Sequence, residues 1–338
     1  MRPEPSPPSP LHIPAEIIWA PSDPVIRGQY RRGRLVRLAP GIYVGAEVFM
    51  KARRHERFLY VAAAKAMRCP DVIFAGETAL LLAGMPIFGT PEVVAVAAQQ
   101  HHRLGSEAPA AAVSSAAAPD LLQAVQQLPR IQRRLRPVEA PDRHGDFWTV
   151  PIDVAVASSA AQLPFCRALA VADGRLRHAA HLALPADALS AAIDEERSRT
   201  KRDRATLVAS LADPLAENGH ESAGRSIMLQ HGFERPELQR RFVDHEGEIF
   251  PDYFFPSRDH AAEGDGFGKY LEPELLRGRT TRQALAEQKH RQSRLEFQSR
   301  GGVSRWSRED VMCRPQVIVQ RLQQVGIPSK PEWRIRLR

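Results

Sequence analysis

The sequence predicts an α/β (α+β) protein with more than one domain. Its 338 residues exceed the usual domain size of about 100–150 residues. Hydrophobic residues make up 43% of the chain and charged residues 25%, which is ordinary for a folded protein. Some segments alternate apolar and polar residues, as strands do, whereas others have helical composition and spacing. We expect an N-terminal hairpin with helices, a helical or α+β middle region, and a C-terminal domain with a small mixed sheet flanked by helices.

The N-terminal region combines a proline-rich start with a basic hairpin. Five of the first ten residues are proline, so residues 1–12 are predicted to be a disordered tail. Tyr30 to Val44 (YRRGRLVRLAPGIYV) predicts a basic turn and two short strands joined at a Pro-Gly turn. Helices are predicted at residues 58–67 and 77–83, and a strand at residues 91–98. The turn and first strand suit contact with DNA phosphates through four arginines: Arg31, Arg32, Arg34 and Arg37.

Two breaks divide the rest of the chain. Residues 105–119 are low-complexity Ala, Ser and Pro, which predicts a linker or a long loop. A short strand near Trp148 leads into helices, the last of them a charged helix that we expect to be solvated. A break follows at Asp213-Pro214, because a residue before proline is pushed out of the helical region. We therefore expect five segments: a tail (1–12), an N-terminal region (13–104), a middle region (105–212), a C-terminal domain (213–328) and a basic tail (329–338).

Charge and cysteine content bound the partners and the compartment. Lys and Arg number 47 against 39 acidic residues, a formal net charge of +8, which favours polyanionic partners such as DNA. The three cysteines, Cys69, Cys166 and Cys313, lie outside any CxxC pattern, which argues against a disulfide framework and a zinc site. The first residues do not resemble an export signal, and the sequence has no run of about 18 uncharged apolar residues. We expect a cytoplasmic protein without a membrane span.

Three carboxylates stand out in the last third of the chain. Residues 220–326 predict a helix, three strands, a helix, a strand and a helix, with a hairpin turn at His245 to Gly247. Glu221 lies in the opening helix, Asp252 at the second strand of the hairpin, and Glu263 toward the end of the third strand. This layout can bring the three together, and convergent carboxylates suit a hard divalent cation such as magnesium.

Six motifs in order, over about residues 213–326, resemble the PD-(D/E)xK-type nuclease domain allied to very-short-patch-repair endonucleases. They include ESxxR from Glu221, PDYFFP from Pro251, EGDGxxKY from Glu263 and RWxxxD from Arg305. That domain is often fused behind an AbiEi-like antitoxin region of type IV toxin–antitoxin systems. RRGRLVRLAPGIYV and AGETALLLAGMP resemble the wing and the following helix of that region, more loosely. The resemblance implies a winged-helix-like N-terminal segment and a restriction-endonuclease-like C-terminal domain.

This resemblance further implies a metal-dependent DNA endonuclease that uses magnesium, or manganese. Asp252 and Glu263 would hold the metal, and Glu221 would complete the site or orient a metal-bound water. Gln239 would line the site, with Arg225 as a supporting residue. DNA would be the substrate, and a cognate toxin protein is a possible second partner.

The slot in which the family pattern has a catalytic lysine holds Asp265 in this sequence. Lys269 could supply the missing cation from beyond the next turn, or Asp265 could act as an extra ligand or general base. On the basic helix that follows, three residues would contact DNA phosphates: Lys289, Arg291 and Arg294.

Each candidate also has a simpler interpretation. Glu221 and Arg225 are four residues apart and could form a surface pair on one helix. Asp252 could be a turn residue, since aspartate favours turns. The strand before Glu263 begins His-Ala-Ala, which is poor in β-branched residues for a buried strand. The alternative hypothesis is a non-catalytic DNA-binding regulator or an antitoxin in which only the nuclease fold survives.

Overall fold

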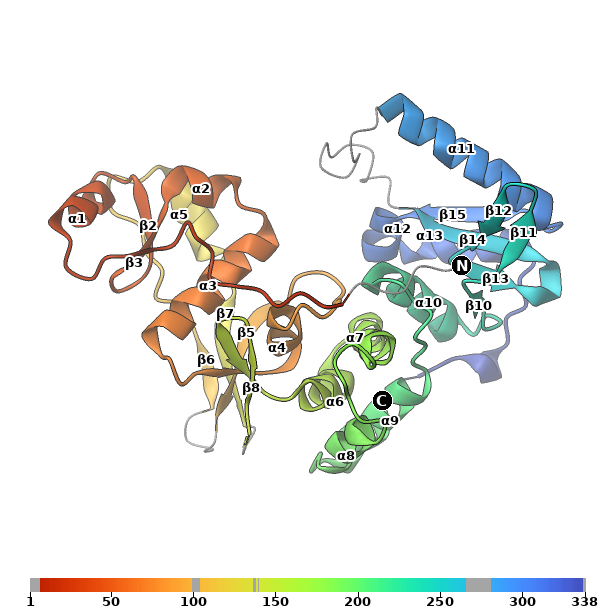
Figure 1. The fold of residues 1–338 in the computed structure, drawn as a ribbon, viewed down its shortest axis with the longest axis horizontal. Coiled ribbons are helices and arrows are strands. Elements are labelled where there is room, and N and C mark those ends of the chain that lie inside the picture. Colours follow the sequence, from red (N-terminus) through yellow and green to blue (C-terminus); the bar gives the residue numbers. More distant parts are fainter. Residues whose placement is uncertain (1–6, 99–103, 136–137, 139, 266–280, 337–338) are drawn as a thin grey trace. The chain divides into compact units, whose positions relative to one another are not determined.

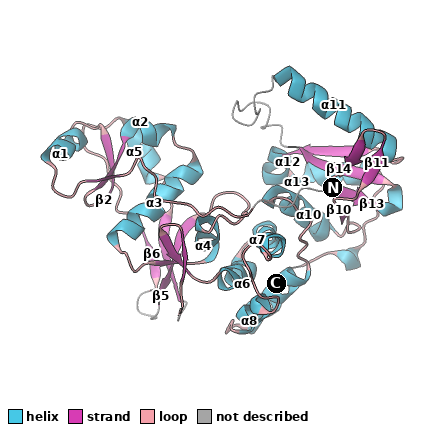
Figure 2. Cartoon of the chain, viewed as in Figure 1, coloured by secondary structure: helices cyan, strands magenta, loops and turns pink. Residues whose placement is uncertain are grey.

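A computed structural model describes residues 7–98, 104–135, 138, 140–265 and 281–336 (Figure 1). The chain divides into two compact units, Pro8–Ser159 and a second one that begins at Ala160. Mixed and antiparallel sheets with flanking helices occur in both units, which confirms the α/β (α+β) fold class (Figure 2). Among the described residues, no helix combines the length and the apolar character needed to cross a membrane.

The first unit opens with a helix and a small sheet that carries the predicted hairpin. Asp23 caps helix α1 (Pro24–Arg31), because its side chain accepts hydrogen bonds from the N–H groups of Val25 and Ile26. Strands β2 (Leu35–Ala39) and β3 (Ile42–Gly45) pair antiparallel, and β1 (Ile18–Trp19) adds to β3. Both strands fall in the segment for which they were predicted. Helices α2 (Ala46–Lys51) and α3 (Arg54–Arg68) follow and pack on this sheet.

A six-stranded sheet forms the other half of the first unit, in the order β6-β7-β5-β4-β9-β8. Helices α4 (Gly76–Leu82) and α5 (Pro119–Gln126) lie in its connections. The boundary expected at residue 105 falls inside this sheet, because β7 pairs with β5 along its whole length. The strands are β4 (Ile73–Phe74), β5 (Val93–Ala98), β6 (Gly105–Glu107), β7 (Arg130–Leu135), β8 (Asp142–His144) and β9 (Phe147–Thr149).

The end of the predicted N-terminal tail is packed on the first unit. The Leu11 N–H donates to the carbonyl of Leu82 at 2.9 Å. Nδ1 of His12 and the backbone N–H of Ile13 both lie within hydrogen-bond distance of the Asp146 carboxylate. Residues 7–12 are therefore ordered, contrary to the prediction, whereas residues 1–6 lie outside the described residues.

Helices dominate the start of the second unit. Helix α6 (Ile152–Gln162) leads into it, and α7 (Phe165–His178) packs against α9 (Arg199–Ser210) and α10 (Gly219–His231). Helix α8 (Ala188–Asp194) packs on α9. A loop separates α9 from α10 at the predicted Asp213-Pro214 break. Because α7 packs so extensively on α10, residues 160–212 belong to the same compact unit as the predicted C-terminal domain.

The C-terminal part contains the small mixed sheet that the sequence predicts (Figure 1). Strands β10 (Glu237–Leu238), β13 (Tyr253–Phe255), β14 (His260–Asp265) and β15 (Val303–Ser307) form it in that order. The β13/β14 pair is antiparallel, and the β14/β15 pair is parallel, with helix α11 (Thr281–Gln298) in the crossover. Strands β11 (Phe242–Asp244) and β12 (Gly247–Ile249) form a separate hairpin. Helices α12 (Arg308–Cys313) and α13 (Pro315–Gln324) follow.

Two expectations about this part change. Asp252 does not lie on the second hairpin strand, which is β12; it lies in the bend between β12 and β13. The basic tail from residue 329 is bonded to the end of α10, because Lys330 N–H donates to the Gly232 carbonyl and Ile335 N–H to that of Leu229. The tail therefore covers the C-terminal end of α10.

Candidate active site

The three predicted carboxylates come from three consecutive parts of the mixed-sheet region. Asn218 caps α10, because its side-chain oxygen accepts hydrogen bonds from His220 N–H and Glu221 N–H, and this cap sets Glu221 in the first helical turn. Asp252 immediately precedes β13, and Glu263 lies on β14, one residue past the last β13/β14 pair. Glu221 and Glu263 are buried, and Asp252 is partly buried.

Asp252 is held by its neighbours on both sides. Its Oδ2 accepts a hydrogen bond from Gly264 N–H at 2.8 Å, and its backbone carbonyl accepts one from Gln239 N–H at 3.5 Å. A Cβ at position 264 would lie 3.4 Å from Nε1 of Trp306 and 3.7 Å from Oδ2 of Asp252, which are ordinary van der Waals distances.

Glu221 is bonded at both carboxylate oxygens. Oε2 accepts from Glu217 N–H at 2.7 Å, and Oε1 accepts from Nδ2 of Asn218 at 2.6 Å. Nε2 of Gln239 lies 3.5 Å from Oε2, so Gln239 contacts both Glu221 and Asp252. Its φ of +52° is a left-handed conformation that costs a non-glycine residue about 1–3 kcal/mol.

The carboxylates repel one another electrostatically. Burial first and the charge of Glu263 second raise the pKa of Asp252 to about 7, with the Gly264 N–H and Arg291 acting in the opposite direction. Burial likewise raises the pKa of Glu221 to about 8, with the charge of Asp252 as the next cause. Glu263, Asp252 and Glu221 therefore form a chain of acids, in which each neighbour disfavours ionisation of the next.

Two arginines hold Glu263. Arg305 faces it directly across the β14/β15 ladder and its guanidinium donates to Oε2. Arg291, on α11, donates from Nε to Oε1 at 3.1 Å and from Nη2 to the carbonyl of Phe250 at 2.6 Å. From the sequence, Arg291 was expected to contact DNA and Arg305 was given no role. The RW motif begins at Arg305 but does not indicate the partner of this residue.

The donors at this site fit a hard divalent cation in kind. Burial first and the charge of a neighbouring acid second raise the pKa values of Asp252 and Glu221, and a cation would relieve the repulsive part. Carboxylate oxygens are the ligands that magnesium and manganese prefer. No cluster of three His, Cys, Asp or Glu side chains ready to hold a metal is found among the described residues. Each oxygen of Glu263 already accepts from an arginine, so a cation bound there would share the carboxylate with a guanidinium.

Arg225 lies away from the carboxylates. Its Nη2 donates to Oδ1 of Asp173 at 2.6 Å and its Nη1 to the carbonyl of Leu211 at 2.8 Å. Both charged side chains are buried, and burial raises the pKa of Asp173 despite the arginine. Arg225 therefore joins α10 to α7 and does not form the predicted surface pair with Glu221.

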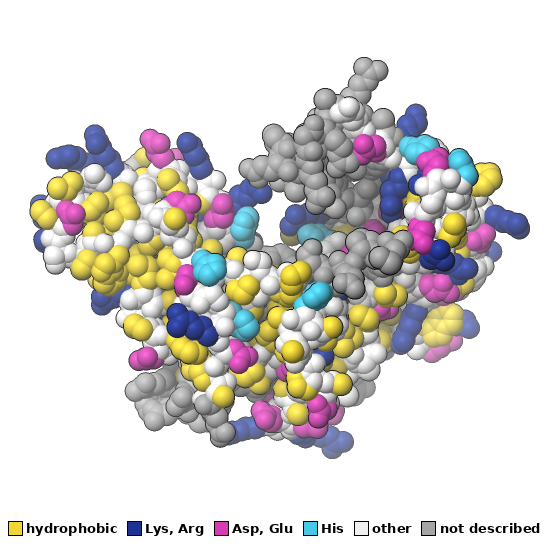
Figure 3. All heavy atoms as spheres, in the orientation of Figure 1, with side chains coloured by type: hydrophobic (Ala, Val, Ile, Leu, Met, Phe, Trp, Pro, Cys, Tyr) yellow, Lys and Arg dark blue, Asp and Glu magenta, His cyan; other side chains and the backbone are white. Residues whose placement is uncertain are grey.

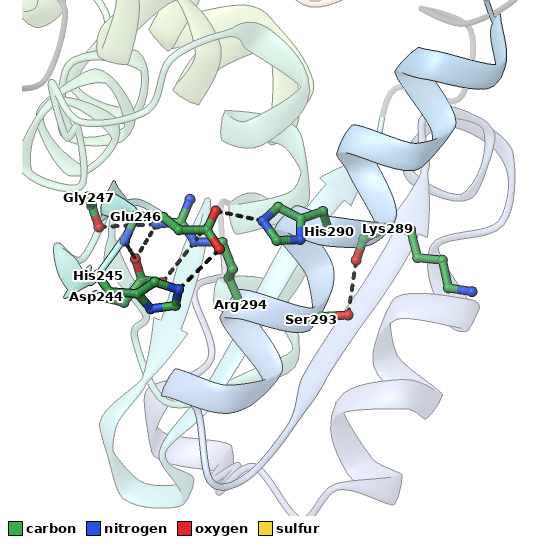
Figure 4. Close-up of polar contacts among 8 residues, drawn as sticks. All are labelled: Asp244, His245, Glu246, Gly247, Lys289, His290, Ser293 and Arg294. Atoms are coloured by element: carbon green, nitrogen blue, oxygen red, sulfur yellow. Dashed lines mark hydrogen bonds and ion pairs between the residues drawn. The ribbon is translucent and has the colours of Figure 1, made fainter.

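Helix α11 places its three predicted DNA contacts differently. Arg294 points into the hairpin, where Nε and Nη2 donate to the Asp244 carboxylate at 2.8 and 2.7 Å and Nη2 also reaches the Gly247 carbonyl (Figure 4). His290 lies 2.6 Å from Glu246 on the same hairpin. Lys289 points the other way and is exposed (Figure 4). Lys289 thus remains available to DNA, whereas Arg294 holds the hairpin to the helix.

The arginines of the N-terminal unit are mostly exposed. Arg31, Arg32 and Arg34 are exposed at the end of α1 and the start of β2. Dark blue Lys and Arg side chains stand out from the surface around α1 (Figure 3). Arg37 is partly buried, and its guanidinium lies 5.5 Å from the centre of the Tyr30 ring. Three of the four predicted phosphate contacts are therefore accessible.

Two predicted residues have no described side chain. The backbone of Asp265 ends β14, opposite Ser307 of β15, but its side chain is not described. Lys269 lies outside the described residues altogether.

Comparison with known proteins gives relatives without an assigned activity. No family model matches the chain, and no solved structure matches it. It is similar to Uncharacterized protein MT2308 of Mycobacterium tuberculosis strain CDC 1551 / Oshkosh and to Uncharacterized protein Rv2248 of strain ATCC 25618 / H37Rv. Each is 32% identical over 160 residues, which is 47% of this chain and 56% of the relative. The chain thus spans about half the length of the curated relatives it matches, and their names indicate no function.

Proposed function

We propose that the protein is a metal-dependent endodeoxyribonuclease, which hydrolyses DNA phosphodiesters at the site of Glu221, Asp252 and Glu263. The observation that carries the proposal is the electrostatic chain of three acids from α10, the β12–β13 bend and β14. Acids far apart in sequence that meet at one site, two of them with raised pKa values as for Glu221 and Asp252, are typical of functional sites.

The roles of the residues follow from their contacts. Asp252 and Glu263 would hold magnesium or manganese, which when bound lowers the pKa of a water and neutralises charge on the phosphate. Glu221, with its raised pKa, is suited to accept a proton from the attacking water. Gln239 positions Glu221 and Asp252 relative to each other through its two contacts.

The rest of the molecule supports an action on DNA. The mixed-sheet region keeps the predicted outline of a helix, strands, a helix, a strand and a helical end, although in its described residues five strands precede α11 where three were expected and two helices follow β15. Arg31, Arg32 and Arg34 of the first unit are exposed and suit phosphate contacts that position DNA without reading its sequence. The proposal thus includes an AbiEi-like DNA-binding region joined to the nuclease, acting on DNA in the cytoplasm.

A second function is favoured by one specific observation. Both oxygens of Glu263 accept from arginines, so the acid site is partly neutralised by the protein itself. A site that is neutralised in this way could serve as a rigid platform in a non-catalytic DNA-binding regulator, or in an antitoxin that binds a toxin protein.

Cleavage of DNA distinguishes the two. Purified full-length protein is incubated with plasmid and with single-stranded DNA, in magnesium, manganese or EDTA. We expect metal-dependent nicking that Asp252→Asn reduces by at least about 100-fold, since the ligand is lost. Asp203→Asn removes an exposed carboxylate on α9 and is the matched control, expected to cut normally. DNA binding without cleavage in every metal would support the regulator instead.

A further inference from the structure

We propose that Arg291 is a displaceable counter-ion of the acid site: it neutralises Glu263 in the cation-free protein and turns to a DNA phosphate when a divalent cation binds. This inference rests on the proposed function and names a further residue in it. It is carried by a difference between the two arginines that contact Glu263.

Arg305 is the fixed member of the pair. Its backbone is in register with Glu263 in the parallel β14/β15 ladder, and its side chain is 16% exposed. Its backbone belongs to the parallel pair of β14 and the edge strand β15. Arg305 therefore keeps Oε2 of Glu263 oriented, and it is a positioning residue.

Arg291 is the movable member. It reaches Glu263 from helix α11, and its side chain is 46% exposed, so water can replace the contacts that it loses. Its Nη2 also donates to the carbonyl of Phe250, which lies two residues before Asp252.

The helix that carries Arg291 is itself anchored. Arg294, one turn further along, is bonded to Asp244, and His290 is close to Glu246 (Figure 4). These contacts hold the helix against the hairpin, and none of them involves the Arg291 side chain. The guanidinium can thus leave Glu263 without any movement of α11.

A divalent cation and the Arg291 guanidinium are both positively charged and are attracted to the same Glu263 carboxylate. Oε1 of Glu263 accepts from Arg291, so a cation that takes this oxygen must compete with the guanidinium. Once displaced, the guanidinium lies at the rim of a site that holds a scissile phosphate. A planar guanidinium binds phosphate oxygens in a bidentate manner and stabilises the negative charge that develops there during hydrolysis.

Manganese binding in the absence of DNA tests whether Arg291 neutralises Glu263 in the cation-free protein. Titration calorimetry compares the full-length wild type with Arg291→Ala, Asp252→Asn and Arg300→Ala. We expect Arg291→Ala to bind Mn²⁺ about fivefold more tightly, because a competing cation at a half-exposed ion pair is removed. Arg300→Ala removes an exposed arginine just beyond α11 and should leave the affinity unchanged. An Arg291→Ala affinity equal to or below that of the wild type would overturn the proposal.

DNA affinity tests whether Arg291 turns to a DNA phosphate when a divalent cation binds. Fluorescence anisotropy with a labelled duplex is measured in Ca²⁺, as a second oxygen-seeking cation, and in EDTA. We expect Arg291→Ala to weaken binding about tenfold in Ca²⁺ and little in EDTA, where Arg291 is engaged with Glu263. An equal loss in both buffers would make Arg291 an ordinary phosphate contact. If the alanine variant does not fold, Arg291→Lys serves instead, with the same cation-dependent difference in smaller measure.

Failure of this inference and failure of the proposed function give different results. If Asp252→Asn does not reduce the Mn²⁺ affinity, or the wild type binds no Mn²⁺, the metal site is wrong and both proposals fall. If Asp252→Asn abolishes Mn²⁺ binding while Arg291→Ala behaves as the wild type, only the displacement of Arg291 is wrong.

Discussion

Gly224 lies where helix α10 comes closest to strand β13. A Cβ there would be 2.6 Å from the Tyr253 hydroxyl oxygen, and Tyr253 is fully buried against Trp306, so its ring has no room to move. Gly224→Ala should therefore break the 2.7 Å hydrogen bond from that hydroxyl to the Glu221 carbonyl. We expect a loss of about 1–3 kcal/mol in the free energy of unfolding, measured in urea.

The matched control for this substitution is Gly28→Ala in helix α1. No atom lies within 4 Å of a Cβ at position 28, and alanine favours a helix more than glycine. This variant should be neutral or slightly more stable than the wild type. Equal losses from both substitutions would show that close packing at Tyr253 is not the cause.

The buried pair of Arg225 and Asp173 leads to a second prediction. Arg225→Met leaves the Asp173 carboxylate buried without its guanidinium partner, which should cost about 3–5 kcal/mol in unfolding free energy. The double variant with Asp173→Asn should recover part of this loss, because the orphaned charge is gone. A double variant no more stable than Arg225→Met would contradict the proposed cause.

At the residue scale, the sequence singled out the acids but not their partners. Glu221, Asp252 and Glu263 were selected because the expected order of helix and strands could bring them together. Arg225 pairs with a residue 52 positions away, and Arg305 with one 42 positions away, and no local spacing reports such contacts. Charged residues four apart on a helix can pair with each other, but in the folded protein either one can pair with a residue of another element instead.

At the element scale, the hairpin β11–β12 depends on helix α11. Arg294 and Asp244 are 18% and 11% exposed, and their double hydrogen bond is the best-shielded contact between the two elements. Arg294→Ala should therefore loosen the hairpin and speed hydrogen exchange of its amides by about tenfold or more, with β14 unaffected. Exchange measured by mass spectrometry checks this. Lys289→Ala, on the exposed side of the same helix, should leave hydrogen exchange in the hairpin unchanged. Unchanged exchange in Arg294→Ala would show that the Arg294–Asp244 contact does not hold the hairpin.

Helices and strands were predicted well where a local sequence pattern specifies them. They were predicted less well where pairing with a strand distant in the sequence decides the structure. The hairpin of β2 and β3 follows from alternation and a Pro-Gly turn. Strand β14 begins His-Ala-Ala, a weak strand sequence, yet it is central because Ala261 and Ala262 are fully buried between β13 and β15. Residues 105–119 resembled a linker in composition, but the β5–β7 pairing encloses them in one sheet.

At the scale of the whole molecule, the acid site links stability to pH. The pKa of Asp252 is raised from 3.8 to about 7 and that of Glu221 from 4.5 to about 8. The folded state thus binds more protons than the unfolded state between about pH 4 and pH 8. The stability that these groups contribute is complete below pH 4 and is lost as the pH rises through 7 and 8.

Other groups act in the opposite direction, so the test must be a comparison. Burial lowers the pKa of His144, His178 and His260, and these histidines make the folded state more stable as the pH rises. The difference in melting temperature between Asp252→Asn and the wild type isolates the acid site, because the histidines are common to both.

We expect the melting temperature of Asp252→Asn to increase relative to that of the wild type as the pH rises from 5 to 8. Removing this carboxylate ends its own titration and relieves the repulsion on Glu221. Each kcal/mol so recovered raises the melting temperature by about 2–4 °C for a unit of this size. Magnesium, if it binds as proposed, should stabilise the wild type most at pH 8 and the variant little, as measured by thermal unfolding with and without the metal. A difference that is constant from pH 5 to 8 would show that Asp252 and Glu221 do not titrate together in this range.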